Sequence, residues 1–179
     1  MDIRKIKTRT KIQDALLTLL SQLSFDKITI SLLCEEAGIN RGTFYLHYND
    51  IFDVFVEIEN AFYKDIMRCL ESGEKDLLLL IFKGVKNHGK LVSLILLKNL
   101  DNDFVDKVIN LAHDYCIYEW KKVRPDASDE ELEYSHSFFS KGMLGLVCYW
   151  CKTNFKASPE DITKMVKNFA SYFSISFDF

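Results

Sequence analysis

Apolar residues recur along most of this chain with the spacing of an α-helix. The first stripe begins at Ile12 and continues 3, 4, 7, 8 and 11 residues later. These positions are Ala15, Leu16, Leu19, Leu20 and Leu23. From Asp50 the helical pattern continues almost to the end of the chain. The spacing therefore predicts an all-α fold of about nine helices, with a three-helix N-terminal part and a larger C-terminal helical bundle.

The expected helix ends follow from capping residues. Ser128 with Glu131 forms a capping box, and Pro159 with two acids suits the first turn of the last helix. Gly73 and Pro125 mark interruptions. The C-terminal helices are expected over residues 50–72, 75–87, 91–98, 104–123 and 128–154, with the last one opening at 158–161.

Residues 29–48 read as two short helices joined by a tight turn. Thr29 is a good N-cap, and Ile28 before it can pack on Leu33, so the first helix is expected to begin near Ile30. Gly38 suits the positive φ at which a helix stops. Asn40 then caps a second helix, expected over residues 41–48.

The second of these helices has one apolar and one outward face. Ile39, Phe44 and Tyr48 are spaced to pack inward. The residues left largely outside are Arg41, Gly42, Thr43, Tyr45 and Leu46, while Tyr45 and His47 suit phosphate contacts. Arginine and threonine can bond base edges in the major groove, so this helix-turn-helix predicts DNA binding. The alternative is an ordinary helical hairpin in an all-helical protein.

Charge is distributed unevenly along the chain. The segment RKIKTRTK over residues 4–11 is a basic arm, in which Lys7 and Arg9 are candidate phosphate contacts, although such an arm alone is more often a solvated terminus. Residues 1–48 hold 7 Lys and Arg against 5 Asp and Glu, a net of +2, whereas the whole chain carries −3. The remaining residues therefore carry −5, and the basic charge lies on the predicted DNA-binding part.

Length and composition suit a soluble chain with two domains. With 179 residues, 48% hydrophobic and 27% charged, the chain can bury a sizeable core. We expect a DNA-binding domain over residues 1–48 and an effector-binding and dimerisation domain over 49–179, without a flexible linker. The absence of a signal sequence pattern and of an apolar run near 18 residues predicts a cytoplasmic protein.

Catalytic and metal-binding patterns are weak. Cys148 and Cys151 form a C-x-x-C within an apolar helical run, without a second pair at zinc spacing. His113 and Cys116 share a helix face, but two ligands without two more are usually packing residues. No nucleophile elbow, phosphate loop or H-E-x-x-H is present, so we expect no enzyme activity, cofactor or metal, and five reduced cysteines.

The run FDKITISLLCEEAGINRGTFYLHY over residues 25–48 resembles the helix-turn-helix of the tetracycline-repressor (TetR/AcrR) family of transcriptional regulators. The matching residues are Ala37, Gly38, Ile39, Asn40, Thr43, Phe44, Tyr45, His47 and Tyr48. The resemblance implies DNA contacts by Thr29, Arg41, Thr43, Tyr45 and His47. Where the family commonly carries a phosphate-binding lysine, three residues after the aromatic that closes the recognition helix, this chain has Ile51.

The last two helices carry stripes suited to self-association. Two glycines permit close helix approach and larger side chains supply area, at Phe138, Gly142, Gly145, Leu146 and Tyr149 on one helix and Ile162, Met165, Val166, Phe169 and Phe173 on the other. These stripes can instead pack within one subunit. Residues 138–162 also resemble the C-terminal region of a Firmicutes-type branch of the same family, which implies a homodimer reading a near-palindromic operator.

The resemblance further implies a DNA-bound regulator that acts as a repressor and is released or altered by a small-molecule effector. Aromatic residues that can line an apolar cavity are Tyr115, Tyr118, Trp120 and Trp150, although such residues are more often core. Two alternatives remain open. The body can be controlled by a protein partner instead of a ligand, or the chain can be a helical dimer that has lost DNA binding.

Overall fold

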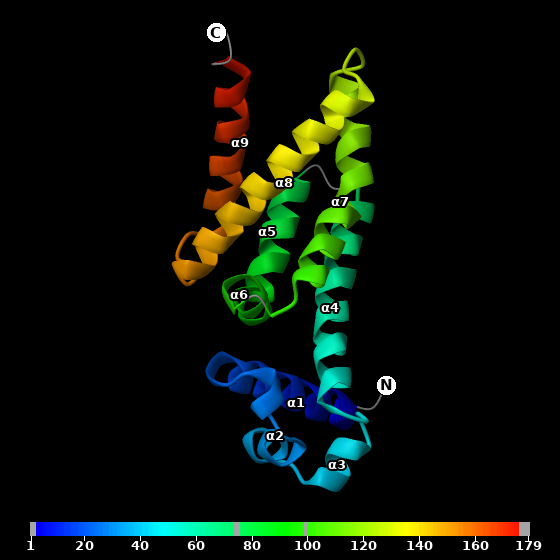
Figure 1. Cartoon of the computed structure of the whole chain (residues 1–179), viewed down its shortest axis with the longest axis vertical. Coiled ribbons are helices and arrows are strands. Elements are labelled where there is room, and N and C mark those ends of the chain that lie inside the picture. The colour runs from blue at the N-terminus through cyan, green and yellow to red at the C-terminus, as the bar shows by residue number, and fades with distance from the viewer. Residues whose placement is uncertain (1–2, 74–75, 99, 176–179) are drawn as a thin grey trace. The chain divides into compact units, whose positions relative to one another are not determined.

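The computed structural model describes residues 3–73, 76–98 and 100–175, with side chains described up to residue 169. Over these residues the chain forms nine α-helices, one short 3-10 turn and no strand (Figure 1). The helices are α1 (Ile3–Gln22), α2 (Ile30–Ala37), α3 (Arg41–Tyr45), α4 (Ile51–Glu71), α5 (Leu77–Asn87), α6 (Gly89–Lys98), α7 (Asn102–Val123), α8 (Asp129–Lys152) and α9 (Pro159–Ile175), and the 3-10 turn is η1 (Phe25–Lys27). The all-α prediction is confirmed.

The chain divides into two compact units between Phe62 and Tyr63, inside α4. The first unit therefore contains α1 to α3 together with the first three turns of α4, and the second contains the remainder. The functional boundary at residue 48 stays a prediction. In the structure, the first compact unit extends into α4 because residues of that helix complete the core of the unit. They include Val54, Phe55 and Ile58, which are 0%, 4% and 6% exposed.

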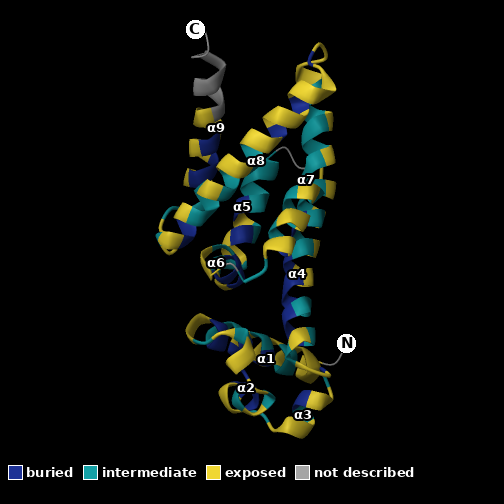
Figure 2. Ribbon diagram, viewed as in Figure 1, coloured by how far each residue is buried: buried dark blue, intermediate teal, exposed yellow. Residues whose placement is uncertain are grey.

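The core of the first unit is built on the apolar stripe of α1. Ile12 and Leu16 of this stripe are completely buried, and α1 packs against α2, which in turn packs against α3 (Figure 2). Phe44 of α3 is also completely buried. Phe25 of η1 meets Phe55 of α4 edge to face, with ring centroids 5.9 Å apart. Burial of these large side chains stabilises the unit.

The second unit packs α5 against α9, and α8 against both α6 and α7. The largest fully buried side chain among its described residues is Trp150 of α8, which meets Phe82 at 5.9 Å and Phe155 at 5.1 Å between ring centroids. The indole N–H of Trp150 donates to the carbonyl oxygen of Ala157 at 3.1 Å, so burial leaves this donor satisfied. Two ion pairs join α9 to the segment of α5, Lys167 with Asp76 and Lys83 with Glu160.

The cap that the sequence predicts for α8 is present, and α9 begins with a similar one. Ser128 accepts a hydrogen bond from the Glu131 N–H at 3.1 Å. Ser158 and Asp161 cap one another at the start of α9, where the Asp161 N–H donates to Ser158 at 3.0 Å and the Ser158 hydroxyl donates to the Asp161 carboxylate at 2.6 Å. Helix starts follow such local bonds because the first N–H groups of a helix have no partner within it. No helix among the described residues has the length and hydropathy needed to cross a membrane.

Candidate DNA-binding interface

The turn between α2 and α3 is formed by short-range hydrogen bonds, as the sequence predicts. Thr29 caps α2 by accepting from the Leu32 N–H at 3.2 Å. Gly38 ends α2 with φ 63° and ψ 40°, in the left-handed region, and the following Ile39 N–H donates to the Cys34 carbonyl at 3.0 Å. Only glycine takes this conformation without steric cost, so the chain turns sharply enough to start a second helix three residues later.

The start of α3 depends on Asn40. Its side-chain oxygen accepts from the Thr43 N–H at 2.7 Å. A Cβ atom added at Gly42 would lie 3.3 Å from this same oxygen, closer than most such contacts. Glycine at position 42 therefore leaves the capping bond undisturbed, and it exposes bare backbone on the outer surface of α3.

The helix is shorter than the predicted range of 41–48, because α3 ends at Tyr45. The His47 N–H donates to the Phe44 carbonyl at 2.9 Å, a three-residue bond that tightens the chain. A new cap for α4 follows at once: the Asp53 N–H donates to Asp50 at 2.8 Å and the Asp53 carboxylate accepts from the Asn49 N–H at 3.0 Å. Hydrogen bonds from the backbone and side-chain N–H groups of Asn49 hold the pKa of Asp53 below its ordinary value.

The two faces of α3 are separated as predicted. Phe44 is completely buried and Tyr48, which follows the helix, is 5% exposed. On the other side Tyr45 is 52% and Leu46 82% exposed. The remaining predicted contacts of this segment are exposed at Thr29, Asn40, Arg41 and Gly42 and half-buried at Thr43 and His47. The exposed and half-buried residues of this segment thus include a cation, hydroxyl groups and an apolar side chain.

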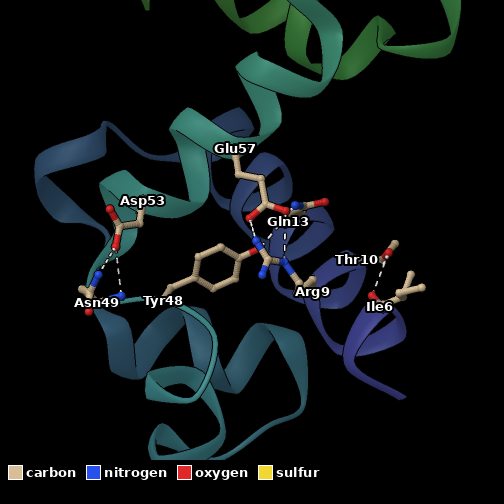
Figure 3. Close-up of polar contacts among 8 residues, drawn as sticks. All are labelled: Ile6, Arg9, Thr10, Gln13, Tyr48, Asn49, Asp53 and Glu57. Carbon is tan, nitrogen blue, oxygen red and sulfur yellow. Dashed lines mark hydrogen bonds and ion pairs between the residues drawn. The ribbon is translucent and has the colours of Figure 1, made fainter. Parts of the chain in front are cut away.

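A polar network holds the end of this segment to α1 and α4 (Figure 3). The Arg9 guanidinium of α1 pairs with the Glu57 carboxylate of α4, with Nε donating to Oε1 at 3.0 Å. The carbon atom of the same guanidinium group lies 5.0 Å from the centroid of the Tyr48 ring. Gln13 of α1 donates from Nε2 to the Tyr48 hydroxyl at 3.2 Å. Tyr48 is therefore restrained by residues from both neighbouring helices.

The electrostatics of this network follow from its partial burial. Burial, and after it the neighbouring Glu57 carboxylate, raises the pKa of Tyr48 to about 12. The hydrogen bond that Arg9 donates to the Glu57 carboxylate raises the pKa of Arg9 above its ordinary value. The tyrosine is thus a neutral hydrogen-bonding group at physiological pH, and the arginine is a cation whose charge is already balanced.

Arg9 accordingly has a structural partner within the first unit, which no local sequence pattern indicates, whereas Lys7 is exposed on α1. No expectation from the sequence named Glu57 or Gln13 as members of this network. A signal existed for Glu57: it lies three residues after the buried Val54 and one before the buried Ile58, so an acidic residue stands at the edge of an apolar stripe.

The aromatic residues predicted for a ligand pocket do not form one cluster. Trp120 packs against His136 and Phe139 of α8, with ring centroids 6.1 Å and 5.6 Å away. Tyr115 is half-buried, and Tyr118 is 63% exposed. Trp150 lies fourteen positions after His136 on α8, or about 21 Å along the helix axis, in the core described above.

The residues predicted for self-association separate into two groups. Ile162 and Val166 are buried within the subunit, at 6% and 5% exposure, because they lie on the face of α9 that packs on α5. Leu146 is half-buried and Phe173 lies outside the described side chains. The group at the surface consists of Phe138, Gly142, Gly145 and Tyr149 on α8 and Met165 and Phe169 on α9.

The residues considered for metal or redox chemistry have other partners. His113 bonds Asp114 through Nδ1 and Glu133 through Nε2, each at 2.9 Å. Among the described residues, no group of three or more histidine, cysteine and acidic side chains is placed to hold a metal ion. All five cysteines are free thiols, and burial raises the pKa of the Cys116 and Cys151 thiols.

Known proteins of similar fold are transcriptional regulators. A solved regulator of the TetR/AcrR family from Aquifex aeolicus VF5 has a TM-score of 0.67 and 16% identity, covering 93% of this chain and 99% of its own. The fatty acid degradation regulator FadR from Bacillus halodurans has a TM-score of 0.64 and 18% identity, covering 96% of both chains. A TetR transcriptional regulator from Streptococcus agalactiae 2603V has a TM-score of 0.62 and 19% identity, covering 90% of this chain and 92% of its own. At these identities the likeness shows the fold.

Sequence comparison identifies the family through the second unit. No curated protein sequence matches the chain. Residues 74–172, more than half of the chain, match a family model described as the C-terminal region of a transcriptional regulator. Together with the helix-turn-helix of the first unit and the regulators that share its fold, this match shows that the chain belongs to the TetR/AcrR family of transcriptional regulators.

Proposed function

We propose that this protein is a cytoplasmic, homodimeric repressor that binds a near-palindromic operator with one α3 helix in each half-site. The observation that carries the proposal is the outer surface of α3, where Arg41, Tyr45 and Leu46 are exposed on a helix whose other face is buried. A helix presented in this way, directly after a glycine turn and a supporting helix, suits insertion into the major groove.

The roles of the individual side chains follow from their chemistry. Arg41 can donate two hydrogen bonds to the O6 and N7 atoms of guanine, and Thr43 can bond a base edge. Tyr45 and His47 suit phosphate oxygens, as does the exposed Lys7 of α1. Phosphate contacts position a protein on DNA whereas base contacts select the sequence, so we assign selectivity to the residues at the start of α3.

The exposed surfaces of α8 and α9 support homodimerisation. Phe138 and Tyr149 on α8 are 69% and 70% exposed, and Phe169 on α9 is 48% exposed. A Cβ atom added at Gly142 or Gly145 would meet nothing within 4 Å, so the backbone of α8 is open to close approach by another helix. A two-fold dimer would present two α3 helices to half-sites about 34–36 Å apart, one turn of DNA.

We further infer that the second unit responds to a small-molecule effector that alters DNA binding. An effector does so only through a difference in its affinity for the DNA-compatible and DNA-incompatible states. The second candidate is control by a protein partner. The separation of Trp150 from Trp120 and the 63% exposure of Tyr118 favour this candidate, because these aromatics do not enclose a common cavity.

The test is titration of the purified protein against the DNA upstream of its own gene, at two salt concentrations, with an unrelated duplex of equal length as the control. We expect selective binding that weakens as salt rises, since each neutralised phosphate releases counterions. Equal and weak binding to both duplexes, followed by failure to select any sequence from a random library, would contradict the proposal. Transcription from the bound promoter with and without the protein then separates repression from activation.

A further inference from the structure

Leu46 is the most exposed large hydrophobic residue of the side chains that the structure describes, at 82%. It follows the last residue of α3 and keeps helical backbone angles, with φ −72° and ψ −14°. Exposed leucines are common on protein surfaces, so exposure alone says little. What distinguishes Leu46 is its position on the surface that α3 presents outward, beside Tyr45 and in line with Gly42.

The geometry of α3 leaves the Leu46 side chain free to project. The Leu46 N–H donates to the Gly42 carbonyl at 3.3 Å, which places the two residues one above the other on the helix. Helical side chains lean toward the N-terminus and cover the residue four positions earlier. Since Gly42 has no side chain, the Leu46 side chain lies above bare backbone. A larger residue at position 42 would crowd Asn40, so this arrangement is tied to the cap of α3.

The partner that suits a single exposed leucine among polar residues is not another protein. Protein interfaces bury on the order of 1,000 Å² around an apolar centre, whereas Leu46 lies between Tyr45 and His47 in the chain and shares its side of the helix with Thr43, three residues earlier. The major groove, in contrast, offers isolated apolar groups at base edges. The 5-methyl group of thymine is the apolar feature that distinguishes its base pair there.

We propose that Leu46 is a specificity-determining residue that contacts the 5-methyl group of a thymine in each operator half-site. The inference rests on the proposed function and deepens it, because it names the chemistry read by the C-terminal end of α3. Arg41 begins α3 and Leu46 follows its last residue, about 7.5 Å further along the axis. The two residues therefore contact different base pairs, and the half-site contains this thymine separately from any guanine bound by Arg41.

The experiment begins by selecting the preferred operator from random duplexes with the full-length protein. Each thymine of one half-site is then replaced singly by deoxyuridine, which removes the methyl group and preserves Watson–Crick pairing. We expect one position at which affinity falls about fourfold for one half-site and about sixteenfold when both are changed, as expected for loss of one buried methyl contact. Leu46→Ala should bind the thymine operator more weakly and should bind the thymine and deoxyuridine operators equally.

Val123→Ala is the matched control, since Val123 is 80% exposed but belongs to α7 of the second unit. This variant should keep the full sensitivity to deoxyuridine, and thermal unfolding should show that Leu46→Ala is folded. A consensus sequence without any deoxyuridine-sensitive position, or an equal sensitivity in Leu46→Ala, overturns the inference and leaves the proposed function intact. A selection that returns no consensus overturns both.

Discussion

The Arg9 guanidinium of α1 pairs with the Glu57 carboxylate of α4 while stacking over the ring of Tyr48, the residue that ends the helix-turn-helix segment. The pair joins positions 48 residues apart in the sequence. Both side chains are about a third exposed, so solvent screens their attraction in part. Through the Arg9–Glu57 pair, α1 and α4 together restrain the segment that carries α3.

Glu57→Gln should lower the free energy of unfolding by about 1 kcal/mol, since it removes the negative partner of a half-buried arginine. Urea unfolding of the full-length protein measures the change. The matched control is Glu36→Gln, which removes the same charge from an exposed position of α2. Equal stability of the two variants would show that the Arg9–Glu57 pair contributes nothing measurable to the first unit.

Asn40 allows capping to be separated from DNA binding. Asn40→Ala should cost about 1 kcal/mol of stability because the Thr43 N–H loses its acceptor. Asn40→Asp keeps an acceptor and should retain stability, yet it should weaken operator binding because a carboxylate beside the DNA repels phosphate. Urea unfolding and DNA titration are measured on both variants. Normal operator affinity of Asn40→Asp would place residue 40 away from the bound DNA.

Arg41→Ala should weaken operator binding by about 1–3 kcal/mol if the arginine bonds a guanine through two hydrogen bonds. Tyr45→Phe should weaken it less, through loss of one phosphate contact. Arg41 is exposed and Tyr45 half-exposed, so both proteins should stay folded and dimeric. Titration with specific and unrelated duplexes gives the result, and unchanged affinity of both variants would contradict the assignment of α3 as the recognition helix.

Phe138→Glu should convert the dimer to monomers, because it places a charge within the exposed apolar stripe of α8. Sedimentation over a range of protein concentrations measures the association. Tyr118→Glu is the control, as Tyr118 is 63% exposed on α7 and lies outside the proposed interface. A monomeric Tyr118 variant together with a dimeric Phe138 variant would move the interface to α7.

The His113–His136 pair predicts a pH dependence of stability at the contact between α7 and α8. The two rings meet edge to face with centroids 4.7 Å apart, and the charged groups facing them are Asp114 and Glu133. Burial, and then His113, lowers the pKa of His136 below its ordinary 6.5, whereas hydrogen bonds to the carboxylates of Asp114 and Glu133 raise the pKa of His113.

The pKa shifts of His136 and His113 have opposite effects on how stability depends on pH. As pH falls below about 6.5, the unfolded chain binds a proton at His136 before the folded chain does, so stability falls. The stability contributed by the bonds of His113 is complete below about pH 6.5 and is lost as pH rises through its raised pKa. Thermal unfolding between pH 5 and 8.5 should therefore show a smaller loss on acidification in His136→Gln than in the native chain. His113→Gln should be destabilised more at low pH than at high pH, and parallel pH curves for all three proteins would refute this account.

Local sequence patterns are enough to predict the helices and most of their ends. Caps such as Thr29, Asn40 and Ser128 act through hydrogen bonds to residues three positions away, and the left-handed turn at Gly38 needs only its own backbone freedom. The same local information predicted the outward residues of α3, because the 3.6-residue period fixes which positions share a face. It overestimated the length of α3, since the competing cap at Asn49 and Asp53 starts α4 immediately afterwards.

Which apolar and charged residues remain at the surface depends on how the helices pack. An apolar stripe has the same pattern whether it packs within its own subunit or against another, so Ile162 and Phe169 were indistinguishable until the packing of α9 on α5 buried one and left the other exposed. Likewise, no local pattern pairs Arg9 with Glu57, because their contact depends on how distant helices pack. Local hydrogen bonding and periodicity act within a few residues, whereas burial and ion pairing depend on the folded arrangement of the whole unit.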